Sequence, residues 1–304
     1  MRRIIAFMYG VAAYVVFLGT FLYAIGFVGN VGVPRSIDSG TAGSFGQALL
    51  LNTLLLALFA AQHSGMARQG FKQWWTKFVP QPIERSTYVL LSSLALLFLF
   101  WQWRPMGGLV WEVDGPLGRL LLRLLFGLGG GIALVSTFLL NHFALFGLRQ
   151  VYLYLCGKEY TPLEFKTPGF YHYVRHPLYV GWLFFFWATP TMTAAHLVLA
   201  LLTTAYILVA IQFEERDLVR IHGHTYEAYR QRVPMLLPQV FRKKDVANQK
   251  VAQTKSSAAT GASSCQRWRA PTVPRAGGAN TKRGGDYAPA KSAPWAWRPH
   301  PDRP

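Results

Sequence analysis

The chain has 304 residues, of which 52% are hydrophobic and only 14% are charged. Soluble domains usually carry about 25% charged residues, so this composition excludes an ordinary soluble protein and indicates a membrane protein. Nearly half of the formal net charge of +18 comes from residues 246–304, and the rest of the chain gives no sign of nucleic-acid binding. The two cysteines, Cys156 and Cys265, are too few for a disulfide framework, and the absence of CxxC and HExxH motifs predicts no metal site.

Four apolar segments have the length of about 20 residues that crosses a bilayer. They are residues 4–28, 43–66, 86–103 and 117–140. The first is too long for a signal peptide and lacks a small-x-small cleavage site, so we expect it to remain as a transmembrane helix. The fourth contains the glycines 129–131, which favour close contact with another helix.

A fifth uncharged run, residues 176–213, is too long for one span. As a single helix it would extend about 57 Å, against a hydrocarbon thickness of about 30 Å. Pro190 lies near its middle and is expected to break it into a hairpin of two short helices. The sequence thus predicts an all-α integral membrane protein with five to six transmembrane helices and a C-terminal helical hairpin. A polar, amphipathic stretch at 214–238 is expected to follow along the membrane face.

Lys and Arg residues in the short loops predict the orientation. Most of them belong to one side of this multi-pass arrangement, which is therefore expected to be cytoplasmic, with both termini on it. We assign residues 1–242 to one membrane domain. Residues 243–304 are basic and of low complexity without apolar periodicity, which predicts a disordered tail that the chemistry does not need.

Four polar clusters interrupt the apolar pattern, all toward the predicted cytoplasmic side. They are Gln62–Ser64, Asn141 with His142, the stretch YHYVRHPLYVGW at 171–182, and Glu214–Arg216. Each alone has an ordinary interpretation, such as a hydrated histidine at a helix end, an arginine that snorkels to the interface or a belt of aromatic residues. Ionisable residues at membrane depth usually serve a function, and the convergence of four clusters predicts a polar pocket with apolar walls.

Such a pocket suits a charged, water-soluble cofactor that meets an apolar substrate. Arg175 is a candidate partner for a carboxylate or phosphate, and Glu214 or Glu215 for an ammonium or ribose hydroxyls. Tyrosine rings at 179, 226 and 229 suit stacking or attraction to a sulfonium. The GLGGG sequence lies inside a predicted span without a preceding strand, so it is not a dinucleotide fingerprint.

Several of these motifs resemble one family of membrane enzymes. RHPLYVGW, EERDL and GHTYEAYRQRVPMLLP, within residues 167–238, resemble the C-terminal signature of the isoprenylcysteine carboxyl methyltransferase superfamily. FLYAIGFVGN, QHSGMAR, ERSTYVLLSSLAL, WQWRPM and NHFALFGLRQVYLYL are similar to its nurim-type branch, and the resemblance extends over residues 1–242. Ala144 is a departure, because an acidic residue commonly occupies its place in that branch.

The resemblance implies a cytoplasmic S-adenosylmethionine pocket in a bacterial inner membrane protein. The implied reaction is methylation of a small apolar thiol, methanethiol, to dimethyl sulfide, without a metal. The implied cofactor-binding residues are His176, Pro177, Tyr179, Gly181, Glu214, Glu215, Tyr226, Tyr229 and Arg230. From the residues themselves, His63, His142 and Arg175 are candidates to activate the thiol. The alternatives are another thiol or a carboxyl acceptor, an NADPH-dependent reductase of the sterol-reductase type, or a membrane protein without catalytic activity.

Overall fold

The computed structural model, described here for residues 1–161 and 163–238, contains five helices long and apolar enough to cross a membrane. They are α1 (Arg2–Gly29), α2 (Phe45–Ala67), α4 (Gln81–Gln102), α5 (Pro116–Leu139) and α9 (Ala194–His222). The four separate predicted spans and the second arm of the hairpin are all present, so the prediction of an all-α integral membrane protein is confirmed. The predicted tail at 243–304 lies outside the described residues.

The third span begins earlier than predicted, at Gln81 rather than near residue 86. Pro80 precedes the helix and Pro82 lies in its first turn, where a proline fits because its missing N–H has no helical partner to lose. Glu84 and Arg85, which precede the predicted span, both lie within this helix. The helix therefore continues beyond the apolar segment into charged sequence.

The hairpin is present, and its two arms are unequal. The first arm, α8 (Pro177–Trp187), is short, and Pro190 lies in the turn that follows it. The second arm, α9, has 29 residues and continues through the polar sequence after Glu214, so the prediction of two short helices is wrong for this arm. Gly223, with a φ of 53°, ends α9 in a conformation that favours glycine, and α10 (His224–Arg232) follows.

Helices α5 and α8 approach each other through two glycines. A Cβ atom on Gly129 would lie 2.6 Å from the backbone nitrogen of Phe185 and 2.7 Å from the carbonyl oxygen of Gly181. A Cβ atom on Gly181 would lie 2.6 Å from the carbonyl oxygen of Gly129. Small residues allow helix backbones this close in membranes, which confirms the packing role predicted for the glycine run.

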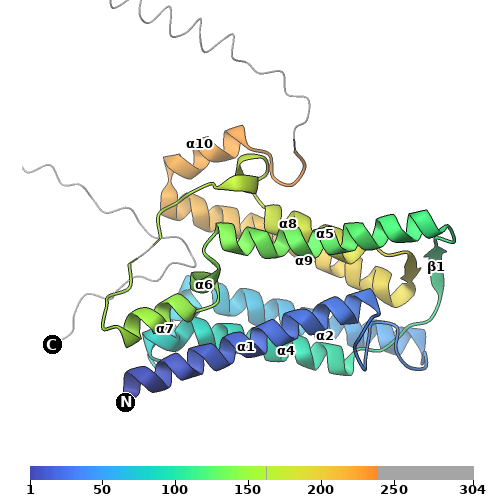
Figure 1. Cartoon of the computed structure of the whole chain (residues 1–304), viewed down its shortest axis with the longest axis horizontal. Helices are drawn as coiled ribbons and strands as arrows, with labels where there is room; N and C mark the ends of the chain where they lie inside the picture. The colour runs from blue at the N-terminus through green and yellow to red at the C-terminus, as the bar shows by residue number, and fades with distance from the viewer. Residues whose placement is uncertain (162, 239–304) are drawn as a thin grey trace, which may run out of the picture. The chain divides into compact units, whose positions relative to one another are not determined.

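Short elements cover the two ends of the helix bundle. At one end β1 (Leu109–Glu112) pairs antiparallel with β2 (Thr191–Thr193). The opposite end carries the start of α1 together with α6 (His142–Leu145), α7 (Leu148–Leu155) and α10, as Figure 1 shows. Helix α3 (Gln69–Trp75) follows directly after α2. None of these short elements had a sequence pattern long enough to predict it.

Candidate active site

The sequence RHP places a cation and an imidazole at the start of α8. Pro177 is the first residue of this helix, where its fixed φ suits a helix start. The two preceding residues run beside the chain that follows α10: the Arg175 N–H donates to the Pro234 carbonyl at 2.9 Å, and the His176 N–H donates to the Met235 carbonyl at 3.2 Å. The C-terminal segment is thereby held against the entrance of α8.

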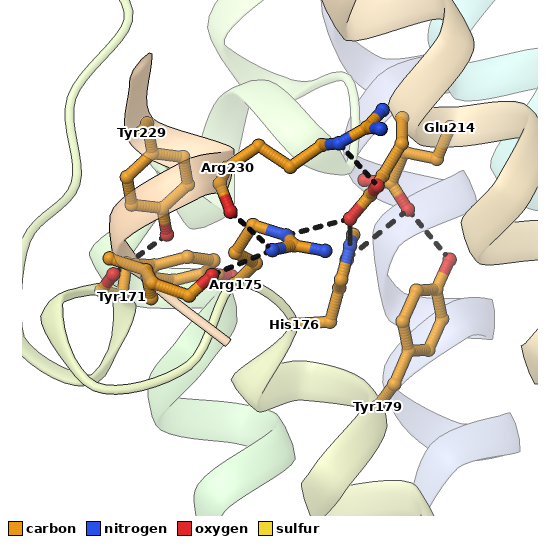
Figure 2. A network of polar contacts seen from close by, with 9 residues as sticks. Tyr171, Arg175, His176, Tyr179, Glu214, Tyr229 and Arg230 are labelled. Atoms are coloured by element: carbon orange, nitrogen blue, oxygen red, sulfur yellow. Dashed lines mark hydrogen bonds and ion pairs between the residues drawn. The ribbon is translucent and has the colours of Figure 1, made fainter. Parts of the chain in front are cut away.

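Arg175 joins three elements with its side chain, as the centre of Figure 2 shows. Its Nε donates to a carboxylate oxygen of Glu215 at 2.7 Å, and its Nη1 donates to the carbonyl oxygens of Arg230 at 2.9 Å and Val233 at 2.6 Å. The side chain is only 10% exposed. Arg175 therefore ties α8 to α9 and to the end of α10, and we call these four residues the arginine clamp.

The two adjacent carboxylates have different surroundings. Consecutive residues on a helix point about 100° apart, because one turn takes 3.6 residues. Glu215 accepts from Arg175 and lies 3.1 Å from Nε2 of His176, and its side chain is 8% exposed. Glu214 is 34% exposed and accepts a 3.0 Å hydrogen bond from the Tyr179 hydroxyl (Figure 2). Glu215 thus belongs to the clamp, and Glu214 is accessible.

Glu214 faces a cavity of about 1150 Å³ inside the helix bundle. Each of the four predicted polar clusters contributes to its wall. The sequence-predicted residues that line it are His63, His142, Arg175, His176, Tyr179, Glu214, Tyr226 and Tyr229. The predicted convergence of these clusters on one pocket is therefore present. Of the other predicted residues, Pro177 starts α8, Gly181 packs against α5, and Glu215 and Arg230 belong to the arginine clamp.

Two buried polar atoms in the cavity wall have no hydrogen-bond partner among the described residues. They are Nε2 of His222 and the hydroxyl of Tyr226. Both side chains contact Phe165, whose ring centroid lies 4.9 Å from that of His222 and 5.8 Å from that of Tyr226. Buried polar atoms are nearly always hydrogen-bonded, so these two suit the polar groups of a bound molecule. His222 directly precedes the GHTYEAY motif, whereas Phe165 lies 58 residues before it, and no sequence pattern marked either side chain as part of the site.

Tyr229 has a structural contact that the sequence did not show. Its hydroxyl donates to the Tyr171 carbonyl at 2.7 Å, which ties α10 to the short 3₁₀ helix η1 (Gly169–His172), as Figure 2 shows. Burial raises the pKa of Tyr229 to about 12, so the hydroxyl stays protonated and able to donate at neutral pH. Tyr229 therefore helps to hold the C-terminal segment closed over the cavity.

Basic side chains from the junction of α2 and α3, from α3 and from α4 also line the cavity. Arg68 pairs with Asp217 at 3.0 Å, and Arg85 donates from Nε to the Leu145 carbonyl at 2.7 Å. Burial, with a smaller contribution from Arg85, lowers the pKa of Lys72 to about 8. From the sequence alone, these cations indicated only the orientation in the membrane. Their position adds positive charge to the polar end of the cavity.

His63 lies deeper, beside two hydroxyl groups. Its Nδ1 is 3.2 Å from the Ser92 hydroxyl, and the Tyr88 hydroxyl lies 3.0 Å from Nδ1 and 3.1 Å from Nε2. Its ring stacks on Phe59 at 5.3 Å. Because a hydroxyl both donates and accepts, this arrangement is compatible with either a neutral or a protonated imidazole.

His142 is held more rigidly than His63. The Thr137 hydroxyl donates to the Leu134 carbonyl at 2.6 Å, so its oxygen accepts from Nδ1–H of His142 at 2.8 Å. Nε2 is then the acceptor for the Tyr14 hydroxyl, also at 2.8 Å. Burial lowers the pKa of His142, which agrees with a neutral ring whose two nitrogens are both engaged. Close by, Ala144 is buried and presents its carbonyl to Gln150.

Comparison with known proteins gives this arrangement a chemical context. Residues 123–225 match the phospholipid methyltransferase family. Methanethiol S-methyltransferase of Crocosphaera subtropica is 59% identical over 243 residues, covering 80% of this chain and 95% of the relative. The Mycobacterium tuberculosis protein of the same name is 57% identical over 238 residues, which cover 78% of this chain and 98% of that protein. Nurim of Mus musculus is 33% identical over 180 residues, which cover 56% of this chain and 68% of nurim. No solved structure matches the chain.

The resemblance first seen in the motifs therefore extends over most of the chain. The matched family includes the part of the chain that carries α8, the glutamate pair and the start of α10. The high identity to the first two relatives also includes the helices before it, since it covers nearly their full length. This chain is a membrane-embedded methyltransferase, and it belongs to the methanethiol S-methyltransferase family.

Proposed function

We propose that this chain transfers the methyl group of S-adenosylmethionine to methanethiol and so forms dimethyl sulfide. The observation that carries the proposal is one cavity with Glu214 and Tyr179 at a polar end and apolar side chains over much of the remaining wall. A charged donor and a small apolar acceptor require such a divided site. The relatives named for this reaction support the choice of acceptor.

The polar end carries groups that match the donor. S-adenosylmethionine supplies, when bound, a methyl group on a positively charged sulfur. Glu214 offers a carboxylate to its ammonium or ribose hydroxyls, and the unpaired atoms of His222 and Tyr226 offer further hydrogen bonds. Lys72 contributes positive charge toward a carboxylate, and the Phe165 ring offers a stacking surface. The donor set thus fits a nucleoside that carries an amino acid.

The acceptor must lose a proton in the reaction. Methyl transfer forms a carbon–sulfur bond to methanethiol, breaks the one to the donor sulfur, which keeps the electron pair, and releases the thiol proton. Arg175 is engaged in the clamp, and the two ring nitrogens of His142 are held by separate partners. The single Tyr88 hydroxyl lies within hydrogen-bond distance of both ring nitrogens of His63 and can leave Nε2 open to the thiol, so we assign proton removal to His63. The thiolate is the reactive form of a thiol, and apolar walls that exclude water favour its attack.

We assign the polar end of the cavity to the cytoplasmic side. Arg68, Lys72 and Arg85 at this end, together with the basic residues of α10, agree with the excess of positive charge on cytoplasmic loops. S-adenosylmethionine is a soluble metabolite and would reach the cavity from this side. A bacterial inner membrane is the expected location.

Expression in a bacterium that lacks the activity tests the proposal. Cells supplied with methanethiol are expected to release dimethyl sulfide, measured by gas chromatography of the headspace, and the Glu214→Gln variant is expected to release much less. Equilibrium dialysis with labelled S-adenosylmethionine separates the two halves of the proposal. Membranes that bind S-adenosylmethionine but form no dimethyl sulfide would show that methanethiol is not the acceptor. Membranes that do not bind S-adenosylmethionine would show that it is not the methyl donor.

A further inference from the structure

The cavity is larger than the two proposed substrates require. Its volume of about 1150 Å³ exceeds the range of about 300–1,000 Å³ that is typical for one drug-sized ligand. Methanethiol has two non-hydrogen atoms and adds a volume on the order of 60 Å³, about that of two water molecules. Space therefore remains after a donor and methanethiol are placed.

The remaining space extends along the bundle. On α9 the cavity wall includes Glu214 at the polar end and Leu199 at the inner end, which are about 22 Å apart at 1.5 Å per residue. On α4 it reaches from Arg85 to Phe100, again about 22 Å. The cavity is thus elongated, and its long direction follows the helices.

The inner part of the cavity is apolar. Beyond His63 its wall is formed mainly by aliphatic and aromatic side chains, among them Phe21, Ala24, Leu56, Leu96, Leu99 and Leu199. Of the hydroxyls in this part, which also include Thr53, two are engaged with their own helices: Ser93 donates to the Val89 carbonyl at 2.8 Å, and Thr203 to the Leu199 carbonyl at 2.6 Å. Such a surface suits hydrocarbon, because the charged groups of the donor would lose their hydrogen bonds there.

A belt of hydroxyl groups separates the polar end from this apolar part. The Ser64 and Tyr206 hydroxyls are 2.9 Å apart, and Tyr88 and Ser92 contact His63. A thiol group placed at this belt, where His63 is available for its proton, would direct any attached carbon chain inward, away from the polar end. The belt therefore divides the cavity into a place for sulfur and a place for carbon.

The inner end is limited by well-packed side chains. The Phe27 ring lies 4.6 Å from Phe100 and 6.0 Å from Trp103 between centroids. Behind them the buried side chain of Asn52 makes two hydrogen bonds to the backbone of Arg104, at 2.8 and 3.0 Å. This packing sets an upper limit on the length of a chain that the cavity accepts.

We propose that the inner cavity binds the hydrocarbon chain of larger thiols, so that the acceptors of this enzyme include straight-chain alkanethiols. The inference rests on the proposed methyl transfer and broadens its substrate class. The same bonds form and break as with methanethiol. The alkanethiol sulfur gains the methyl group, the donor sulfur keeps the electron pair, and the thiol proton is transferred to His63.

A thiol series with the full-length protein in lipid nanodiscs tests the inference. With S-adenosylmethionine present, methanethiol, butanethiol and octanethiol are compared by kcat/KM from the amount of methyl sulfide formed. We expect octanethiol to equal or exceed methanethiol, because a methylene group in an apolar pocket is worth about tenfold or more. Methylation of methanethiol with at least a tenfold lower value for octanethiol would overturn the inference. Methylation of octanethiol alone would support it and refute methanethiol as the acceptor, and methylation of neither would refute both.

A pair of variants on α4 locates the chain within the cavity. Leu96 lines the inner part, whereas Leu94 is 47% exposed on the outside of the bundle. Leu96→Trp is expected to lower the ratio of octanethiol to methanethiol kcat/KM at least tenfold, and Leu94→Trp to keep the wild-type ratio. Size-exclusion chromatography checks that both variants fold. If Leu94→Trp does not fold, Leu97→Phe serves as the control instead, because Leu97 is outside the cavity lining. Equal ratios in the folded variants would contradict the placement of the chain in this part of the cavity.

Discussion

Glu214 and Glu215 are adjacent in the chain, but their substitution should produce different defects. Glu214 faces the cavity, so Glu214→Gln removes a charge that the proposed donor contacts and leaves the arginine clamp intact. Hydrogen bonds to charged groups contribute about 1.5–3 kcal/mol, which predicts a rise of roughly tenfold to a hundredfold in the KM for S-adenosylmethionine. Steady-state kinetics measure this KM. Glu227→Gln, on the exposed face of α10, is the matched control. A KM equal to that of the wild type would contradict the role of Glu214.

Glu215→Gln should instead reduce stability. Glu215 is the buried carboxylate of the arginine clamp, and the neutral amide would leave the Arg175 guanidinium buried without a counter-charge. Removal of one partner of a buried ion pair costs about 3 kcal/mol or more. Thermal unfolding in detergent should show a clearly lower Tm than that of Glu214→Gln. Equal Tm values for the two variants would show that the clamp does not hold the C-terminal segment.

His142 provides a prediction about pH. Burial lowers the pKa of its imidazole in the folded protein below the unfolded value of about 6.5, so the unfolded chain binds the proton more readily. The neutral, buried ring therefore contributes its full stabilisation above the unfolded pKa of about 6.5, and this contribution is lost as the pH falls through the lower pKa of the folded protein. Between about pH 7.5 and pH 5 the wild type should lose more stability than His142→Gln, as measured by Tm at each pH. An identical pH dependence of the two proteins would contradict the assignment of a neutral, buried ring.

The sequence identified many residues of the cavity but not their partners. Ionisable residues such as His63 and Glu214 stand out because they interrupt apolar segments, and this signal requires no knowledge of the fold. The partners of Arg175 depend on the fold: Glu215 is 40 residues away, and two other acceptors are backbone carbonyls that have no side-chain signature. His222 was missed for a similar reason, since a histidine in a polar stretch looks like an exposed residue.

At the level of elements, the contact between α5 and α8 places the RHP sequence over the cavity. Gly181→Ala would put a methyl group 2.6 Å from backbone atoms of α5 and force the helices apart. Overpacking of this kind costs about 1–3 kcal/mol, so we expect a lower Tm and lower activity. Gly131→Ala is the matched control, because a Cβ atom there has no neighbour within 4 Å. If both variants had the Tm of the wild type, the close approach of the two helices would not be important for stability.

The elements that could be predicted are those with a long, uniform signal. Spans of more than 20 apolar residues are recognisable from hydropathy alone, and Pro190 marks the turn of the hairpin. The predicted ends of these helices were less accurate, because α4 and α9 continue into polar sequence beyond the apolar segments. Helices as short as α6 and strands as short as β2 depend on tertiary contacts that a single sequence does not reveal.

For the whole molecule, the cavity depends on both halves of the chain. The match to the phospholipid methyltransferase family begins at residue 123 and includes the RHP sequence and the glutamate pair. Helices α1, α2 and α4 come before it, yet they supply His63, the hydroxyl of Tyr88 and much of the apolar wall. The C-terminal half thus provides Glu214 and Tyr179 of the polar end, and the N-terminal half provides three cations there and much of the apolar surface that an acceptor would contact. Differences in acceptor among relatives are therefore expected to arise mainly from residues before 123.

The cavity-lining residues also predict the minimal active chain. All of them lie between Phe17 and Tyr229, and the arginine clamp ends at Val233. Deletion of residues 246–304 should therefore leave methyl transfer and Tm unchanged, whereas deletion of 223–304 removes α10 with Tyr226 and Tyr229 and should abolish activity. Dimethyl sulfide formation by membranes that contain equal amounts of each protein measures both effects. Loss of activity in the shorter deletion, with the protein still inserted in the membrane, would show that the basic C-terminal segment takes part in the reaction.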